Sequence, residues 1–415
     1  MSILRKQDNV LFASFSPYPN NNRDPKNGNI DPFISFFSKK VNNFVLIDQP
    51  DPGSSIIAPI VEKYSNGRLS KKYKLNFYIY KPLYWFLNTL NVADNRTNVF
   101  YKFRDFLSVL HVGMTSGIKF NYLIGLESIN TLAGLVLKKI GFVDKVIYYV
   151  SDYSPKRYNN KLFNDIYLWL DRLCCYNSDF IWDVSKAMQD ARVEAGLIKK
   201  KSAPIIHVPN ALFPQFIKHL DLNRLIPFSL VFMGSLGYEN GPDLAIETLP
   251  LVLKKFKKVR LHVIGGGKND LPRLKKLVAK LHLENFVKFY GLIPRDEDMY
   301  STLRSFYLGL APYLNLKGSV RLYGDSLKLR AYMVSGIPAI TTEVPPLGRE
   351  LLSFGSVMIT RDNKKDLSLA IIEMLSNGEL YRRYREKAIE YGSGNTWQNS
   401  FEQAFREMGK TVRTV

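Results

Sequence analysis

The residues best suited to chemistry lie in a segment, residues 323–340, that has the pattern of a helix followed by a strand. Asp325 or Ser326 is placed to cap the start of this helix. Gly336 stands where the helix should end, and Pro338 prevents its continuation. The first N–H groups of a helix have no partner within it, and together with the helix dipole they favour an anion. The segment therefore predicts an anion site at its beginning.

Lys328 would lie in the first turn of this helix, where a cation suits a diphosphate. Arg321 and Lys317 lie just upstream and could add positive charge. The alternative is that Lys328 is an ordinary solvated lysine on a helix surface. We favour the phosphate role, and we predict that a nucleotide ligand contacts five residues of this segment: Arg321, Tyr323, Ser326, Leu327 and Lys328.

Glycines follow three predicted strands in the second half of the chain. They are Gly234 after strand 229–233, Gly265 after strand 259–264 and Gly291 after strand 287–290. Glycine permits a sharp turn and lets a ligand approach the main chain closely. One such turn is weak evidence, but three in register at one sheet edge indicate a nucleotide cleft. We expect these turns to contribute Gly234, Ser235, Leu236, Asn240, Gly265 and Leu292 to a nucleotide-sugar site.

Two carboxylates follow predicted strands in the first half of the chain. Glu127 follows strand 121–126, and Asp152 follows strand 146–150 after one serine. Loops after the strands of a parallel sheet lie at its carboxyl edge, where ligands bind. Asp152 is the first candidate catalytic residue and Glu127 the second, because either could hydrogen-bond a donor sugar or orient an acceptor. A structural role, capping the next helix, is equally open.

The chain alternates short apolar strands with amphipathic helices, which is typical of α/β folds with parallel sheets. Its 415 residues suffice for two domains. We predict an N-terminal domain at 1–210, a linker at 211–227, a C-terminal domain at 228–395 and a final helix at 396–415. In the second domain, Pro250 should kink or split the predicted helix 243–256.

The composition limits the possible partners and cofactors. The formal net charge of +21 predicts an anionic partner, such as nucleotide phosphates or a membrane surface, although a generic basic surface is the alternative. No nucleic-acid-binding module is recognisable. The only cysteines, Cys174 and Cys175, are adjacent, and the five histidines are scattered. We therefore expect a reducing compartment, no metal site and no cofactor apart from a donor substrate.

The sequence also bears on location. No apolar run reaches the roughly 18–20 residues that span a bilayer, and the N-terminus lacks the pattern of a signal peptide. We expect a cytoplasmic protein, soluble or peripheral on the inner face of the membrane.

Residues 62–107 mix basic and aromatic side chains without a regular pattern. The basic ones are Lys71, Lys72, Lys74, Lys81, Lys102 and Arg104, and the aromatic ones are Phe77, Tyr78, Tyr80, Tyr84, Trp85, Phe86, Phe100 and Tyr101. This composition fits a segment at a membrane surface and equally an ordinary pair of amphipathic helices. A basic, aromatic-rich first half suggests a lipid-linked or membrane-proximal glycan as acceptor.

The second half of the chain and the later part of the first half resemble the retaining glycosyltransferases of the GT-B fold (family 4-like, glycosyl transferases group 1). Residues 326–340, SLKLRAYMVSGIPAI, are similar to the family segment PLKLFEYLAAGKPVV. Other pieces follow in the family's order. Residues 183–185 resemble the VS before a helix, 208–210 the IPNG junction, 233–243 the VGRL…KGVD turn, 291–294 the GFVP turn, 311–313 the PS or PY strand end, and Trp397 the tryptophan that begins the C-terminal helix.

The resemblance implies two Rossmann-like domains that face each other across a cleft, with a C-terminal helix that returns to the first domain. It implies a hexosyltransferase of polysaccharide biosynthesis, in which a nucleoside-diphosphate sugar binds mainly to the second domain and a glycan or lipid-linked acceptor mainly to the first. Transfer would retain configuration and need no metal. Asp152 best matches the family's strand-end residue that faces the sugar. The loop 20–28, with Arg23, Lys26 and Gly28, would lie across the cleft from the diphosphate.

The chain departs from the family at four positions. Two family glutamates, eight residues apart, fall on Tyr323 and Ala331, and the family's arginine and lysine in the first glycine turn fall on Ser235 and Asn240. In the family the second glutamate holds the nucleotide ribose, and the first lies near the donor sugar. The missing cations make Lys328 and its upstream arginine more important. The same departures motivate the alternative, a non-catalytic nucleotide-sugar-binding or scaffold protein on this fold.

Overall fold

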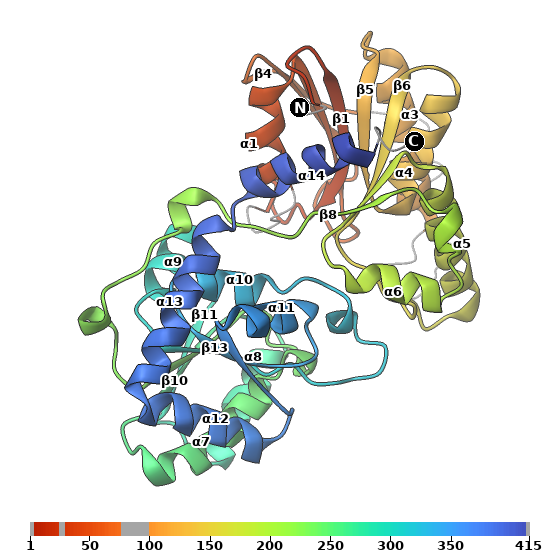
Figure 1. Ribbon diagram of the computed structural model, residues 1–415. Coiled ribbons are helices and arrows are strands. Elements are labelled where there is room, and N and C mark those ends of the chain that lie inside the picture. Colours follow the sequence, from red (N-terminus) through yellow and green to blue (C-terminus); the bar gives the residue numbers. More distant parts are fainter. Residues whose placement is uncertain (1–3, 25–29, 76–98, 412–415) are drawn as a thin grey trace. The chain divides into compact units, whose positions relative to one another are not determined.

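The computed structural model describes residues 4–24, 30–75 and 99–411, drawn as a coloured ribbon in Figure 1. They form two compact units. The first consists of Met1–Val184, Met188–Val208 and Phe401–Val415, and the second of Ser185–Ala187 and Pro209–Ser400. Some residues singled out in the sequence lie outside the described ones, namely Lys26, Gly28, Phe77, Tyr78, Tyr80, Lys81, Tyr84, Trp85 and Phe86.

The described strands of the first unit form one sheet in the order β4-β3-β2-β1-β5-β6-β7-β8. Strands β2, β1, β5, β6, β7 and β8 pair in parallel, as the alternation of strands and helices predicts. The middle strands are almost continuously buried, which explains their unbroken apolar runs. The bounds are β1 Asn9–Ser16, β2 Asn43–Pro50, β3 Ile60–Ser65, β4 Arg68–Lys74, β5 Phe120–Leu126, β6 Val143–Val150, β7 Phe180–Asp183 and β8 Ile205–His207.

The helices of the first unit are α1 Asp31–Lys40, α3 Val99–Thr115, α4 Glu127–Lys139, α5 Lys161–Asn177 and α6 Ala187–Glu194, joined by most of α14 Trp397–Thr411. The C-terminal helix packs by its aromatic side chains. The ring centroids of Phe33 and Phe401 are 4.7 Å apart, and those of Trp182 and Phe405 are 5.4 Å apart. Figure 1 shows α14 beside α1. Phe401 and Phe405 are therefore part of the first unit's core.

The basic segment before residue 76 differs from one of the two sequence interpretations, the pair of amphipathic helices. Lys71, Lys72 and Lys74 lie on the exposed edge strand β4, which pairs antiparallel with β3, so they do not belong to a pair of amphipathic helices. Lysine on an edge strand discourages pairing with another chain. Arg104 is buried in α3, because its guanidinium donates to two main-chain carbonyls and to Asp105. Arg104 therefore cannot belong to a membrane-facing set, whereas the lysines of β4 are exposed.

The described strands of the second unit form a parallel sheet in the order β11-β10-β9-β12-β13-β14. The unit is thus a second Rossmann-like α/β domain. The strand bounds are β9 Ser229–Met233, β10 Arg260–Ile264, β11 Val287–Gly291, β12 Leu308–Ala311, β13 Ala339–Thr342 and β14 Val357–Thr360. The helices are α7 Pro242–Lys255, α8 Asp270–Lys280, α9 Asp296–Leu303, α10 Leu327–Val334, α11 Pro346–Phe354, α12 Lys364–Ser376 and α13 Gly378–Gly394.

Pro250 does not split the helix that contains it. Helix α7 runs unbroken through this proline. A proline costs the helix one N–H···O bond and a steric adjustment. Here the face that carries Ile246, Leu249 and Val252 is buried in the core, and that packing keeps the helix continuous.

Candidate active site

The three predicted glycine turns lie side by side at the carboxyl edge of the second sheet. Gly234 N–H donates to the Ile264 carbonyl at 2.9 Å, and Gly265 N–H donates to the Gly291 carbonyl at 2.9 Å. All three glycines have positive φ, +116°, +155° and +70° in chain order. A Cβ on Gly265 would lie 2.1 Å from the Gly234 carbonyl oxygen. The second turn therefore needs glycine for space as well as for conformation.

Helix α10 begins beside these turns. Ser326 is its N-cap, since its Oγ accepts from Leu329 N–H at 3.3 Å, and the Tyr313 hydroxyl lies 2.7 Å from the same oxygen. Residues 328–334 are all buried, and Lys328 Cε lies 3.5 Å from the position of a Cβ on Gly234. The first turn of the helix thus meets the first glycine turn.

The Lys328 side chain is buried, so the interpretation as a solvated surface lysine is wrong. Among the described residues, its Nζ has no hydrogen-bond partner. It lies 3.6 Å from the centroid of the Phe232 ring and 4.7 Å from that of Tyr313. Burial, and secondly the charge of Arg321, hold the pKa of Lys328 well below its ordinary value. Aromatic faces attract a cation but do not replace the hydrogen bonds of water, so the geometry suits an anionic ligand.

Arg321 is engaged by an acidic residue that the sequence analysis did not single out. Its Nε lies 3.1 Å from Glu239 Oε1, and Ser319 Oγ donates to Glu239 Oε2 at 2.7 Å. The Glu239 carbonyl also accepts from Leu314 N–H at 3.0 Å. Glu239 thus joins the first glycine turn to the loop before α10. The signal that could have found it is a lone acid in a glycine-rich turn opposite a basic loop.

The other predicted contacts of the second unit differ in exposure. Ser235 is exposed, whereas Leu236 and Asn240 are buried. Leu292 is 62% exposed and Leu327 is 49% exposed. The three exposed residues, Ser235, Leu292 and Leu327, flank the glycines and the start of α10, where hydroxyl and apolar groups can meet a ligand. Tyr323 is half-buried after the short helix Val320–Leu322, and Ala331 is buried within α10.

In the first unit, Glu127 occupies a strained and half-buried position at the junction of β5 and α4. Its φ is +64°, a region that non-glycine residues rarely adopt. Among the described residues, Glu127 Oε1 has no hydrogen-bond partner. Burial raises the pKa of this carboxyl to about 7, against the lowering effect of Arg157. Backbone strain and a perturbed pKa together are typical of functional sites.

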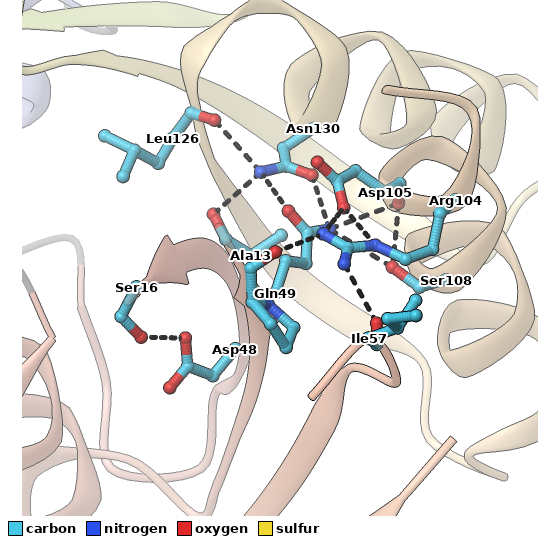
Figure 2. A network of polar contacts seen from close by, with 11 residues as sticks. Ala13, Ser16, Asp48, Gln49, Ile57, Arg104, Asp105, Ser108, Leu126 and Asn130 are labelled. Carbon is cyan, nitrogen blue, oxygen red and sulfur yellow. Dashed lines mark hydrogen bonds and ion pairs between the residues drawn. The ribbon is translucent and has the colours of Figure 1, made fainter. Parts of the chain in front are cut away.

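A buried polar network holds this junction in place (Figure 2). The side chains of Gln49 and Asn130 exchange two hydrogen bonds of 2.8 and 3.0 Å. Asn130 Nδ2 also donates to the Leu126 carbonyl at 3.1 Å, one residue before Glu127. Arg104 donates to carbonyls at the end of β2 and in the following loop. The network fixes the start of α4 against the end of β2 and so positions Glu127.

Asp152, whose side chain is 43% exposed, is paired with Arg157. Arg157 Nη1 lies 3.2 Å from Asp152 Oδ2 and donates to the Asp152 carbonyl at 3.0 Å. Arg157 also couples electrostatically to Glu127. One arginine therefore links the two predicted carboxylates. The sequence analysis missed Arg157, although an arginine five residues after a strand-end aspartate was a signal that could have found it.

A family model for glycosyl transferases group 1 matches residues 224–391, which include the glycine turns and α10. The chain carries a glycosyl transferases group 1 domain. It is a glycosyltransferase, and the resemblance noted in the sequence is confirmed. The match lies wholly within the second unit and ends short of the C-terminal helix.

Curated relatives of this glycosyltransferase are distant. The chain is 24% identical over 317 residues to the O-antigen biosynthesis glycosyltransferase WbnH of Escherichia coli, covering 74% of this chain and 82% of the relative. It is also 24% identical over 290 residues to the uncharacterized glycosyltransferase MJ1069 of Methanocaldococcus jannaschii, covering 66% and 70%.

Solved structures share the fold along the whole glycosyltransferase chain. Sucrose-phosphate synthase from Thermosynechococcus elongatus aligns with a TM-score of 0.69 at 14% identity, covering 98% of both chains. HepE from Anabaena in complex with UDP aligns with a TM-score of 0.65 at 13% identity, covering 98% of this chain and 100% of HepE. At these identities the likeness establishes the fold, two Rossmann-like domains of the GT-B type.

The described residues of the glycosyltransferase include no helix that is long and apolar enough to cross a bilayer. Nor do those residues bring three His, Cys, Asp or Glu side chains together where they could hold a metal ion.

Arg23, from the loop expected to face the diphosphate, is engaged within the first unit of the glycosyltransferase. Its Nε lies 2.5 Å from Asp48 Oδ2, and its Nη2 lies 2.9 Å from Glu62 Oε1. Tyr18 and Ser16 also donate to Asp48. With two carboxylates bound to its guanidinium, Arg23 pins the loop after β1 to the neighbouring strands β2 and β3.

Replacing Glu127 by glutamine is expected to change how the stability of the glycosyltransferase depends on pH. The folded pKa of about 7 is above the ordinary value, so the native state binds a proton that the unfolded chain has lost. Wild-type stability therefore falls as pH rises from about 5 to 7. Because glutamine cannot ionise, the variant should be more stable than wild type at pH 8, by on the order of 2 kcal/mol, and equal to it near pH 5.

Urea unfolding at pH 5 and pH 8 measures this difference. Glu194→Gln, at an exposed carboxylate of α6, is the matched control and should leave the pH profile unchanged. Parallel profiles for wild type and Glu127→Gln would show that Glu127 is an ordinary ionised glutamate.

Proposed function

We propose that the second unit binds a nucleoside-diphosphate sugar and that Lys328 holds its diphosphate. The observation that carries this proposal is the buried Nζ of Lys328, which has no hydrogen-bond partner among the described residues and lies between the first glycine turn and the start of α10. A buried cation without a partner is costly, and a phosphate oxygen would supply what it lacks. The N-terminus of α10 favours the same negative charge.

In this proposal the second unit acts mainly on the leaving group. When the bond between the sugar and the diphosphate breaks, negative charge develops on the diphosphate, and a preorganised cation and helix dipole stabilise that charge. Arg321, positioned by Glu239, would contribute guanidinium N–H donors. The transfer would need no metal, because these groups supply the compensation. The solved complexes of HepE with UDP and with UDP-glucose support a nucleotide-sugar donor.

We further propose that the acceptor, a glycan or a lipid-linked glycan, binds mainly to the first unit and that transfer retains configuration. Glu127 and Asp152 would orient the acceptor hydroxyl or the donor sugar. Resemblance to retaining enzymes supports the stereochemistry, and the O-antigen relative supports a glycan acceptor. The net charge of +21 supports a peripheral position on the inner face of an anionic membrane in the cytoplasm.

The departures at Tyr323 and Ala331 limit how the donor can be held. Ala331 is buried and carries no acceptor group, so it cannot bind the ribose as the family glutamate does. Main-chain groups of the glycine turns and the Tyr323 hydroxyl are the candidates for that contact. These departures are also what would favour a protein that binds the nucleotide sugar and does not transfer it.

A thermal-shift panel of UDP, GDP, ADP, CDP and their common sugar conjugates tests the donor site on the full-length protein. We expect one base to stabilise the protein selectively, because a ligand that binds only the folded state raises the melting temperature. The same panel with the nucleosides alone is the control and should give little stabilisation, since the diphosphate carries the proposed contact. No stabilisation by any member would overturn the donor assignment.

A further inference from the structure

Two adjoining hollows lie at the carboxyl edge of the first unit's sheet. One has a volume of about 300 Å³ and the other of about 400 Å³. They share four lining residues: Phe15, Lys102, Arg157 and Tyr158. Nothing in the nucleotide-sugar site accounts for either hollow.

The smaller hollow, called here the apolar hollow, is bounded mainly by hydrocarbon. Its walls include Val99 of α3 and Phe163, Ile166, Tyr167 and Leu170 of α5. Ile166 is also 44% exposed, so this wall continues to the protein surface. Leu162 and Trp169, on the same helix, are exposed as well. An apolar wall that opens onto exposed apolar side chains suits a chain that extends out of the protein.

The cations lie where the two hollows meet. Lys102 and Arg157 line both. Arg157 makes both of its contacts with Asp152 through Nη1, and a planar guanidinium carries five donors in all. Glu127 lines the apolar hollow beside them with a buried oxygen. An anionic group at this boundary would meet two positive charges, and a hydroxyl beside it would meet a carboxyl.

The larger hollow, called here the charged hollow, is lined about equally by polar and apolar groups and contains most of the carboxylates. Its lining includes Asp51, Tyr101 and Asp105. Burial raises the pKa of Asp51 to about 6, against the lowering effect of Lys102. Carboxylates, tyrosine hydroxyls and aromatic faces are the groups that hold sugar hydroxyls and sugar rings. The two hollows therefore present an apolar wall first, then the two cations, and then the carboxylates and the tyrosine of the charged hollow.

We propose that the two hollows bind the acceptor and that this acceptor is a sugar joined through a phosphate to a long apolar chain. The chain occupies the apolar hollow, the phosphate contacts Lys102 and Arg157, and the sugar occupies the charged hollow. This inference rests on the proposed function and narrows its acceptor to the lipid-linked class. A free glycan would leave the apolar hollow empty, and a free apolar chain would leave the two cations without their anion.

Titration calorimetry of the full-length protein with three probes separates these ligand classes. The probes are farnesyl phosphate, farnesol and inorganic phosphate, each below the concentration at which it aggregates. We expect farnesyl phosphate to bind at least about tenfold more tightly than either of the others, because only it uses both the apolar wall and the cations. Equal binding of inorganic phosphate would reduce the site to an anion site, and equal binding of farnesol would reduce it to an apolar pocket. Either result, or no binding, would overturn the proposal.

Two variants with matched controls locate the binding. Ile166→Ser and Lys102→Gln should each weaken farnesyl phosphate about tenfold. Ile140→Ser, at a 50% exposed isoleucine after α4, and Lys119→Gln, at an exposed lysine, should leave it unchanged. Equal losses in variants and controls would indicate non-specific adsorption and refute the assignment.

The farnesyl phosphate experiment tests the acceptor proposal independently of the donor assignment. A Lys328 variant should keep farnesyl phosphate binding, since Lys328 belongs to the second unit. If the nucleotide panel fails while farnesyl phosphate binds, the donor proposal fails alone; if the panel succeeds and farnesyl phosphate does not bind, the lipid-linked acceptor fails alone.

Discussion

Replacing Lys328 by methionine is expected to raise the melting temperature of the ligand-free glycosyltransferase and to weaken its nucleoside diphosphate about a hundredfold or more. Both effects have one cause. The buried ammonium costs free energy without its anion, and an apolar chain of similar length removes that cost. The same change removes a charge-assisted bond to the diphosphate, which is worth about 2–3 kcal/mol or more when buried. Thermal melting without ligand and calorimetry with the nucleotide selected by the panel measure the two effects.

The test is specific because it predicts two opposite effects, a higher melting temperature and a lower nucleotide affinity. Lys275→Met, at an exposed lysine of α8, is the control and should change neither quantity appreciably. A loss of binding together with a loss of stability would mean that Lys328 is a structural residue and that the weaker binding follows from damage to the fold. Unchanged affinity would remove Lys328 from the donor site.

Replacing Gly265 by alanine is expected to destabilise the protein by several kcal/mol and to abolish donor binding. Its added Cβ would lie 2.1 Å from the Gly234 carbonyl oxygen, so the two glycine turns would have to separate. A main-chain oxygen cannot move away from a clash as easily as the end of a flexible side chain can. The residue also has a φ of +155°, which alanine resists. Urea unfolding and nucleotide calorimetry report the two consequences.

Gly291→Ala is the matched control for the steric clash between the added Cβ of residue 265 and the Gly234 carbonyl oxygen. Gly291 also has positive φ, +70°, but a Cβ there would meet no atom within 4 Å. Its cost should be limited to backbone strain, about 1–2 kcal/mol, with donor binding retained. If both alanine variants lost the same stability and donor affinity, the close approach of the two turns would not explain the effect of Gly265→Ala.

The sequence predicts the central parts of both sheets well, because buried parallel strands are apolar throughout and end at glycine or a polar residue. This rule does not predict strand β4. Its residues are almost all exposed, so Lys71, Lys72 and Lys74 carry no alternating pattern. What places this strand is its pairing with β3 at the edge of the sheet, and such pairing is not a local property of the sequence.

In the candidate site, too, some features could be predicted from the sequence and others depend on the fold. The cap at Ser326 and the glycine turns follow from local rules that the sequence displays. The burial of Lys328 does not, because α10 is covered on every side and has no amphipathic pattern from which an inward face could be read. The pairing of Arg321 with Glu239 joins residues far apart in the chain and depends on the fold. The hollows that share Arg157 depend on it equally.

The packing of α14 in the first unit has a consequence for biosynthesis. Domains generally fold in the order in which the ribosome releases them. Here residues 209–400, almost the whole second unit, emerge before Phe401 and Phe405 are made. Until then the rings of Phe33 and Trp182 lack the partners that complete their cluster. The first unit is thus completed after the second, and a nascent chain keeps an aromatic surface uncovered until Phe401 and Phe405 have been translated.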